Sequence, residues 1–238
     1  RPGWHLECSA MSEKTLGLPF DIHSGGLDLT FPHHENEIAQ SCSAHKKTDD
    51  PKYFAKYWFH NGFVIVNGEK MSKSIGNIRL VHELNKNYRG EVLRLSLLSS
   101  HYRKPLDWTS ERITNSEQWL FRFYQKLKIV KDIEINENQC EIPNNIMEAL
   151  CNDLNMPAVL AILSHMTNYI STETSLDKKK KFKKEIIAVG KLLGLLQENP
   201  DRWPTRGKEN DKDPDEVMLA NWCVTQRVRK KKGKLKNK

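Results

Sequence analysis

Three amphipathic stripes in the second half of the chain place the strongest constraint on its fold. Apolar residues recur there every three or four positions, the spacing that puts side chains on one face of a helix. The stripes are Trp119, Leu120, Phe123, Leu127 and Val130, then Val159, Leu160, Leu163, Met166 and Ile170, and finally Phe182, Ile186, Val189, Leu193 and Leu196. Because an amphipathic helix buries its apolar face against a neighbour, residues 116–200 are predicted to form an all-α helical bundle domain.

The first 80 residues show a different pattern, in which strand and helix signals are mixed. Residues 19–23 and 63–66 are strand candidates, and the second one runs into Asn67-Gly68, a strong hairpin signal. Residues 69–71 supply the returning strand, and residues 33–42, which follow a proline, are predicted to be helical. We therefore expect an α/β layer in residues 1–80, ahead of the helical bundle.

The sequence argues against two classes of protein, those that span a membrane and those held together by disulfide bonds. No stretch approaches the roughly 20 apolar residues of a membrane span, and the five cysteines are scattered rather than paired, which favours a reducing, cytoplasmic location. The net charge of +8 comes from residues 227–238, which carry eight basic side chains and no acids. The remainder is balanced at 30 basic and 30 acidic residues, so overall charge says little about nucleic-acid binding. Residues 201–238 are predicted to be a polar and basic tail without fixed structure.

A histidine and a glutamate four residues apart form the first candidate site. On a helix His33 and Glu37 project from the same face, whereas His34 shares its face with Ile38. Cys8 is the nearest thiol upstream, and a set of sulfur, imidazole and carboxylate donors suits zinc better than magnesium or calcium. From spacing alone, a helix start with ordinary hydrogen-bonded histidines explains these residues equally well.

A second candidate site is the lysine-containing loop after the predicted hairpin. It consists of Lys70, Met71, Ser72, Lys73 and Ser74. Two ammonium groups three residues apart on a hydroxyl-rich loop can converge on phosphate oxygens. A random pair of lysines at this spacing is better explained as a solvated turn, but the full string KMSKS is much rarer by chance.

The KMSKS string, followed by Ile75-Gly76-Asn77, resembles the signature loop of class I aminoacyl-tRNA synthetases. Seven further motifs, in the right order, resemble the cysteine-specific family, the cysteinyl-tRNA synthetases. These motifs are GWHLECS at 3–9, FDIHSGG at 20–26, FPHHENE at 31–37, EVLR at 91–94, HYR with PLDW between 101 and 108, and DLNMP at 153–157. The resemblance covers roughly residues 1–200.

The resemblance implies a set of site residues. In this family one zinc ion is held by two cysteines, a histidine and a glutamate, and Cys8, His33 and Glu37 fall on three of these positions. The zinc binds the substrate thiolate, and serine is rejected because a hydroxyl is a poor soft ligand. By the same resemblance Trp4 and His23 line the amino-acid pocket. Two further residues, Gly26 and Asp28, approach the adenosine ribose of ATP.

The resemblance also implies catalytic roles on the lysine loop. Lys70 and Lys73 stabilise the phosphates of ATP, bound with Mg²⁺, while Met71, Ser72 and Ser74 complete the loop. The reaction is activation of L-cysteine as cysteinyl-adenylate and its transfer to tRNA(Cys). Residues 1–80 are expected to be the downstream part of a Rossmann-type catalytic domain, residues 81–115 a connecting region that contacts the tRNA stem, and residues 116–200 a tRNA-binding domain.

Some features depart from the family pattern. The HIGH motif and the fourth zinc ligand are not found in these 238 residues, and Ser24 replaces a usual glycine. We therefore expect a catalytic part that is inactive alone and needs a missing or separately encoded N-terminal half. Two alternatives remain: a non-catalytic tRNA-binding module or remnant, and a small zinc-stabilised structural protein, which calls for four internal ligands where three are found.

Overall fold

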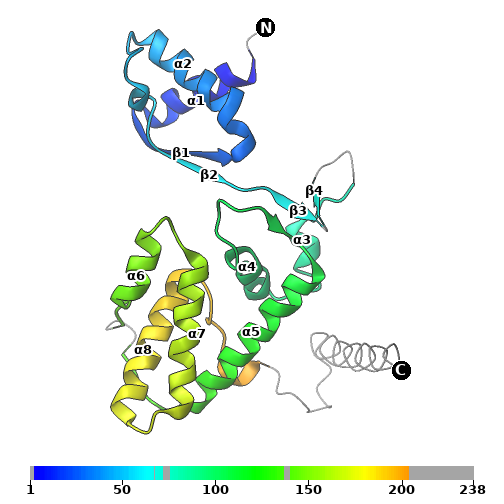
Figure 1. The fold of residues 1–238 in the computed structure, drawn as a ribbon, viewed down its shortest axis with the longest axis vertical. Helices are drawn as coiled ribbons and strands as arrows, with labels where there is room; N and C mark the ends of the chain where they lie inside the picture. Colours follow the sequence, from blue (N-terminus) through cyan, green and yellow to red (C-terminus); the bar gives the residue numbers. More distant parts are fainter. Residues whose placement is uncertain (1–2, 67, 72–75, 137–139, 204–238) are drawn as a thin grey trace, which may run out of the picture. The chain divides into compact units, whose positions relative to one another are not determined.

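The computed structural model describes residues 3–66, 68–71, 76–136 and 140–203 (Figure 1). Among these residues the chain divides into two compact units. The first unit contains the described residues up to Asn77 together with Ser100–Thr109, and the second contains Ile78–Ser99 and the residues from Ser110 onward. The predicted connecting region, residues 81–115, is thus shared between the two units.

The first unit combines short helices with parallel and antiparallel strands. In chain order it contains α1 (Trp4–Leu16), β1 (Phe20–Gly26), η1 (Leu27–Leu29), η2 (Thr30–His34), α2 (Glu35–Ala44), η3 (Pro51–Tyr53), β2 (Ala55–Asn61), β3 (Val64–Val66), β4 (Glu69–Lys70) and β5 (Leu106–Asp107). Strands β1 and β2 pair in parallel, with Phe20 opposite Ala55 and Gly26 opposite Asn61. Strand β3 lies between β4, its antiparallel partner, and β5, its parallel partner.

The core of the β1–β2 sheet is small. Phe20, Phe54 and Ala55 are buried, and Leu18, Ile38 and Trp58 pack against them. Ile38 lies on α2, so this cluster attaches α2 to the sheet and fixes the position of the helix that carries Glu37.

The second unit is helical, with α3 (Val81–Leu84), α4 (Gly90–Leu98), α5 (Ser110–Ile129), α6 (Asn144–Cys151), α7 (Met156–Thr172), α8 (Leu176–Leu193) and η5 (Pro200–Arg202). Helices α5, α7 and α8 carry the three predicted stripes, and Leu120, Leu163 and Ile186 from these stripes are fully buried. Helix α8 is capped by Ser175, whose hydroxyl accepts a hydrogen bond from the Lys178 amide. The predicted fold class, an α/β part followed by an all-α bundle, is confirmed.

The last described segment of the second unit is attached through a half-buried carboxylate. Glu91 on α4 accepts hydrogen bonds from the Tyr124 hydroxyl at 2.8 and 3.1 Å and from the Gln197 amide at 3.0 Å. The same hydroxyl accepts a hydrogen bond from the Glu198 amide at 3.0 Å, and the Trp203 ring stacks on the Tyr124 ring at 4.4 Å. These contacts hold residues 197–203 against α4 and α5.

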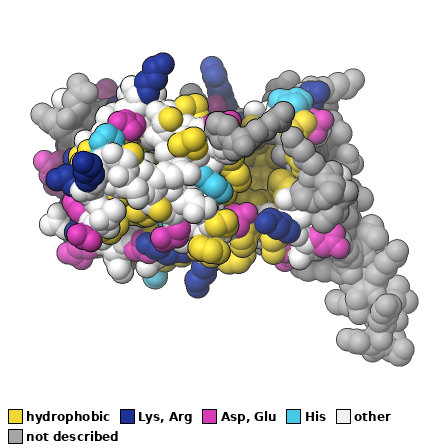
Figure 2. Space-filling view, turned by 90° about the horizontal axis from the view of Figure 1, so that it is seen from above, with side chains coloured by type: hydrophobic (Ala, Val, Ile, Leu, Met, Phe, Trp, Pro, Cys, Tyr) yellow, Lys and Arg dark blue, Asp and Glu magenta, His cyan; other side chains and the backbone are white. Residues whose placement is uncertain are grey.

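The structure differs from the sequence-based expectations in two places. The polar tail was placed from residue 201 onward, but Pro200–Arg202 forms η5 and Trp203 is 3% exposed, because its ring packs on Tyr124. The rest of that tail, residues 204–238, lies outside the described residues. Helix α1 was not predicted at all: it exposes Trp4, Met11 and Leu16, so it has no apolar stripe. Hydrophobic side chains are visible among charged ones on the face shown in Figure 2.

Within the described residues, none of the helices combines the length and apolar character needed to cross a membrane.

Candidate metal centre

Three elements bring the predicted metal ligands together. Cys8 lies on α1, His33 lies in η2, and Glu37 lies in the first turn of α2. One donor atom from each residue lies within 4.8 Å of the other two. His33 Nε2 and Glu37 Oε1 are 3.4 Å apart, as expected for residues four positions apart on neighbouring turns. The residues that were widely separated in the sequence therefore share one small volume.

The state of the Glu37 carboxylate indicates that this volume fits a cation. Glu37 is completely buried, and its Oε1 has no hydrogen-bond partner although it faces His33. A buried carboxylate oxygen without a partner is costly unless a metal or a donor satisfies it. Burial raises the pKa of the Cys8 thiol, and the nearby Glu37 carboxylate raises it further. A bound dication reverses both effects, because it favours the thiolate and balances the carboxylate. One sulfur, one nitrogen and one oxygen donor match the borderline-soft preference of zinc.

His23 contacts this centre through Glu37. Its Nε2 lies 2.8 Å from Glu37 Oε2, so the second carboxylate oxygen is hydrogen-bonded while the first is not. The resemblance implied that His23 lines an amino-acid pocket; in the structure it contacts the Glu37 oxygen other than the one nearest His33. Trp4, the other predicted pocket residue, stacks on the His33 ring with centroids 4.0 Å apart and is 57% exposed.

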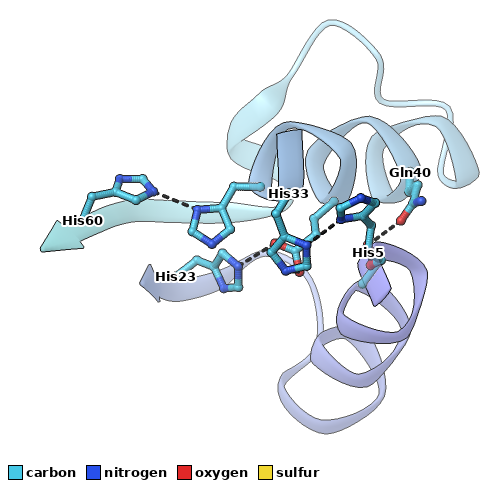
Figure 3. Close-up of polar contacts among 8 residues, drawn as sticks. His5, His23, His33, Gln40 and His60 are labelled. Atoms are coloured by element: carbon cyan, nitrogen blue, oxygen red, sulfur yellow. Dashed lines mark hydrogen bonds and ion pairs between the residues drawn. The ribbon is translucent and has the colours of Figure 1, made fainter. Parts of the chain in front are cut away.

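Three histidines near the centre were not singled out as site residues from the sequence: His5, His34 and His60. His34 is buried and its Nδ1 lies 2.8 Å from His60 Nε2, a contact drawn in Figure 3. Burial, followed by the neighbouring His23, lowers the pKa of His34 to about 4, so this imidazole is neutral at pH 7. The one sequence feature that relates to His34 is Gly25. A Cβ at that position would meet His34 Cε1 at 2.9 Å, so glycine leaves room for the imidazole ring.

The predicted ATP residues that the structure describes also come together. Lys70 Nζ lies 3.3 Å from Asp28 Oδ2 and 4.6 Å from the centroid of the Phe63 ring. Gly26 is next to this pair, since a Cβ on it would lie 2.6 Å from Asp28 Oδ1. Met71 follows directly, and its amide donates to the Val64 carbonyl at 3.3 Å.

The remaining predicted loop residues, Ser72, Lys73 and Ser74, lie outside the described residues.

Comparisons with known proteins agree in pointing to one family. A family described as "tRNA synthetases class I (C) catalytic domain" matches residues 1–118. A Cysteine--tRNA ligase from Parvibaculum lavamentivorans is 48% identical over 203 residues, covering 85% of this chain and 42% of that protein. One from Ehrlichia ruminantium is 46% identical over 222 residues, covering 93% of this chain and 47% of that protein. The chain thus spans less than half the length of these relatives.

A solved structure supports the fold. The Agrobacterium radiobacter K84 agnB2 LeuRS–tRNA–LeuAMS ternary complex aligns with a TM-score of 0.55 at 17% identity, over 79% of this chain and 29% of that one. Such a likeness establishes shared architecture only, whereas the sequence identities above are specific. The chain belongs to the cysteinyl-tRNA synthetase family of class I tRNA synthetases.

Proposed function

We propose that this chain is the downstream part of a cysteine–tRNA ligase, which joins L-cysteine to tRNA(Cys) at the expense of ATP. Relatives with this name are 46–48% identical to it, and they are more than twice as long as the aligned part. The observation that carries the proposal is the buried Glu37 oxygen, which has no hydrogen-bond partner, beside the Cys8 thiol and the His33 imidazole. A centre of this composition recognises sulfur, which is what distinguishes cysteine from other small amino acids.

In this proposal Cys8, His33 and Glu37 hold one Zn²⁺ ion. Bound zinc supplies a soft Lewis acid for the substrate thiolate, and a serine hydroxyl cannot replace that ligand at similar affinity. His23 fixes the Glu37 carboxylate through its hydrogen bond at 2.8 Å. Trp4 covers the His33 ring and lines the amino-acid pocket from the α1 side.

The lysine loop serves the phosphates of ATP. The cysteine carboxylate attacks the α-phosphorus, pyrophosphate leaves, and cysteinyl-adenylate forms; a ribose hydroxyl of the tRNA then attacks the carbonyl carbon and AMP leaves. Lys70 and Lys73 stabilise the charge that develops on the phosphates, together with Mg²⁺. Asp28, which contacts Lys70 in this structure, and Gly26 approach the ribose of ATP.

Metal substitution in the 238-residue chain tests whether the centre recognises sulfur. Co²⁺ added to the metal-free protein is expected to give a thiolate-to-metal charge-transfer band that Cys8→Ser abolishes. L-cysteine is expected to change this spectrum, whereas L-serine at the same concentration leaves it unchanged. If cysteine and serine act alike, the centre does not select sulfur and the proposal fails.

Aminoacylation tests the catalytic role. The chain alone is expected to give no cysteine-dependent pyrophosphate exchange, and mixing it with the upstream half of a full-length relative is expected to restore charging of tRNA(Cys). Restored charging should be lost with Lys73→Ala. Binding of tRNA by the helical residues 116–200 that survives Lys70→Ala and Lys73→Ala, with no charging in any mixture, favours the alternative of a non-catalytic tRNA-binding module.

A further inference from the structure

His5 makes a direct contact with the proposed ligand His33. The Nδ1 atoms of the two rings lie 2.6 Å apart, a short hydrogen bond between α1 and η2 that Figure 3 displays. One turn further along α1 the Ser9 hydroxyl donates to Gln40 Oε1 at 3.0 Å. Cys8 lies between these two contacts in the sequence. These two contacts, which join α1 to η2 and to α2, therefore flank the thiol on its helix.

The short distance between the two Nδ1 atoms ties the protonation of one ring to that of the other. A neutral imidazole carries one proton on its two nitrogens, so in this hydrogen bond one ring donates and the other accepts. If His33 donates, its proton is on Nδ1 and its Nε2 lone pair is free to bind a metal. If His5 donates instead, the proton of His33 must be on Nε2, and that nitrogen cannot be a ligand.

The proposed metal site favours the first of these two arrangements. His33 Nε2 is the nitrogen that faces Glu37 Oε1, at 3.4 Å, and Nδ1 is the one that faces His5. Metal-binding histidines generally donate their second N–H to a neighbouring acceptor, which fixes the ring and the tautomer. No other hydrogen bond is recorded for His33 Nδ1 among the described residues, and the Trp4 ring covers one face of the imidazole.

We propose that His5 is a positioning residue of the metal centre. Its Nδ1 accepts the hydrogen bond from His33 Nδ1, which keeps His33 in the tautomer that presents Nε2 to the metal. His5 itself carries its proton on Nε2 and is not a ligand. This inference rests on the proposed zinc site and assigns the acceptor that the site requires.

Zinc affinity of the full 238-residue chain tests the inference with two substitutions and a control. His5→Leu removes the acceptor and is expected to weaken zinc binding by about 10–100-fold, the effect usual for removal of such outer partners. His5→Gln offers a side-chain oxygen to the same N–H and is expected to recover most of the lost affinity. The control is His45→Gln, which removes a histidine that pairs with Glu13 at 2.9 Å across the same two helices; it should bind zinc like the parent.

Three outcomes of this titration contradict the inference in different ways. Unchanged affinity of His5→Leu refutes the positioning role while the zinc site stands. Equal losses for Leu and Gln show that the ring is needed for packing rather than as an acceptor. A parent chain that binds no zinc removes the proposed site itself, and the inference with it.

Two spectroscopic measurements complement the titration, and the first, on the parent protein, does not depend on how the variants fold. In the zinc-bound, ¹⁵N-histidine-labelled chain, His33 is expected to be protonated on Nδ1 and His5 on Nε2. The Co²⁺ charge-transfer band is expected to persist in His5→Leu at saturating metal, because Cys8 remains a ligand. A proton on His33 Nε2, or direct metal ligation by His5, overturns the assignment.

Discussion

The hydrogen bonds around Glu91 lead to a quantitative prediction for Tyr124→Phe. This substitution keeps the buried ring and its stacking on Trp203 but removes the hydroxyl that donates to Glu91 at 2.8 Å. A hydrogen bond to a charged group contributes about 1.5–3 kcal/mol. The Glu198 amide also loses its acceptor, but Glu198 is exposed and water can replace it. At pH 8 we expect the helical unit to lose about 2 kcal/mol of unfolding free energy, the middle of the range for one charge-assisted bond.

Urea denaturation followed by far-UV circular dichroism measures this loss. The denaturation midpoint should fall while the slope with denaturant stays the same, because the buried area is unchanged. The matched control is Tyr169→Phe: Tyr169 is 56% exposed, and removing a hydroxyl there should change stability by less than about 0.5 kcal/mol. A loss below about 0.5 kcal/mol for Tyr124→Phe, or a loss equal to the control, refutes the assigned bond.

Three further predictions concern the second unit. Burial raises the pKa of the Glu91 carboxyl above its ordinary value. The stability that the protonated Glu91 carboxyl contributes is therefore fully present below the unfolded pKa and is lost as pH rises through the folded pKa. In urea denaturation at several pH values, Glu91→Gln should thus gain stability relative to the parent as pH rises. Gly190→Ala places a Cβ 2.7 Å from the Leu195 carbonyl oxygen and should cost about 1–3 kcal/mol of stability in thermal unfolding. The control Gly90→Ala adds a Cβ with nothing within 4 Å and should not destabilise the protein. Equal melting temperatures for the two variants would contradict the close approach at Gly190. Leu163→Ala removes a fully buried side chain on α7 and should cost about 2–5 kcal/mol in the same denaturation assay.

The sequence predicted the elements that show their burial as a period. Helices α5, α7 and α8 place one apolar face in the bundle core, so their stripes were visible without any knowledge of the fold. Helix α1 was not visible, because Ser9 is its one buried residue and Trp4, Met11 and Leu16 face outward. Its helical state depends on packing against α2, which local patterns do not encode. Strand β2 was missed for a similar reason: its exposed and half-buried residues do not alternate.

The candidate site was predicted where spacing alone carried the information. His33 and Glu37 are one turn apart on continuous helical backbone, so their shared direction followed from the sequence. Cys8 was first considered only as the nearest thiol upstream. Spacing could not show that it converges on His33, 25 positions away, and the resemblance supplied that assignment. His5 could not be predicted, because its role depends on a contact of two Nδ1 atoms between separate elements.

The division of the chain between the two units has a practical consequence for dissecting the protein. Strand β3, which leads to the lysine loop, is paired in parallel with β5, yet the chain passes through Ile78–Ser99 of the other unit before it returns to form β5. A cut after Asn77 therefore separates β3 from the strand that covers its edge, and Val64 and Ile65 lose their partners Leu106 and Asp107. Expression of the first 77 residues as an isolated piece is thus a poor way to study the metal centre, and truncations should keep the chain intact through Thr109.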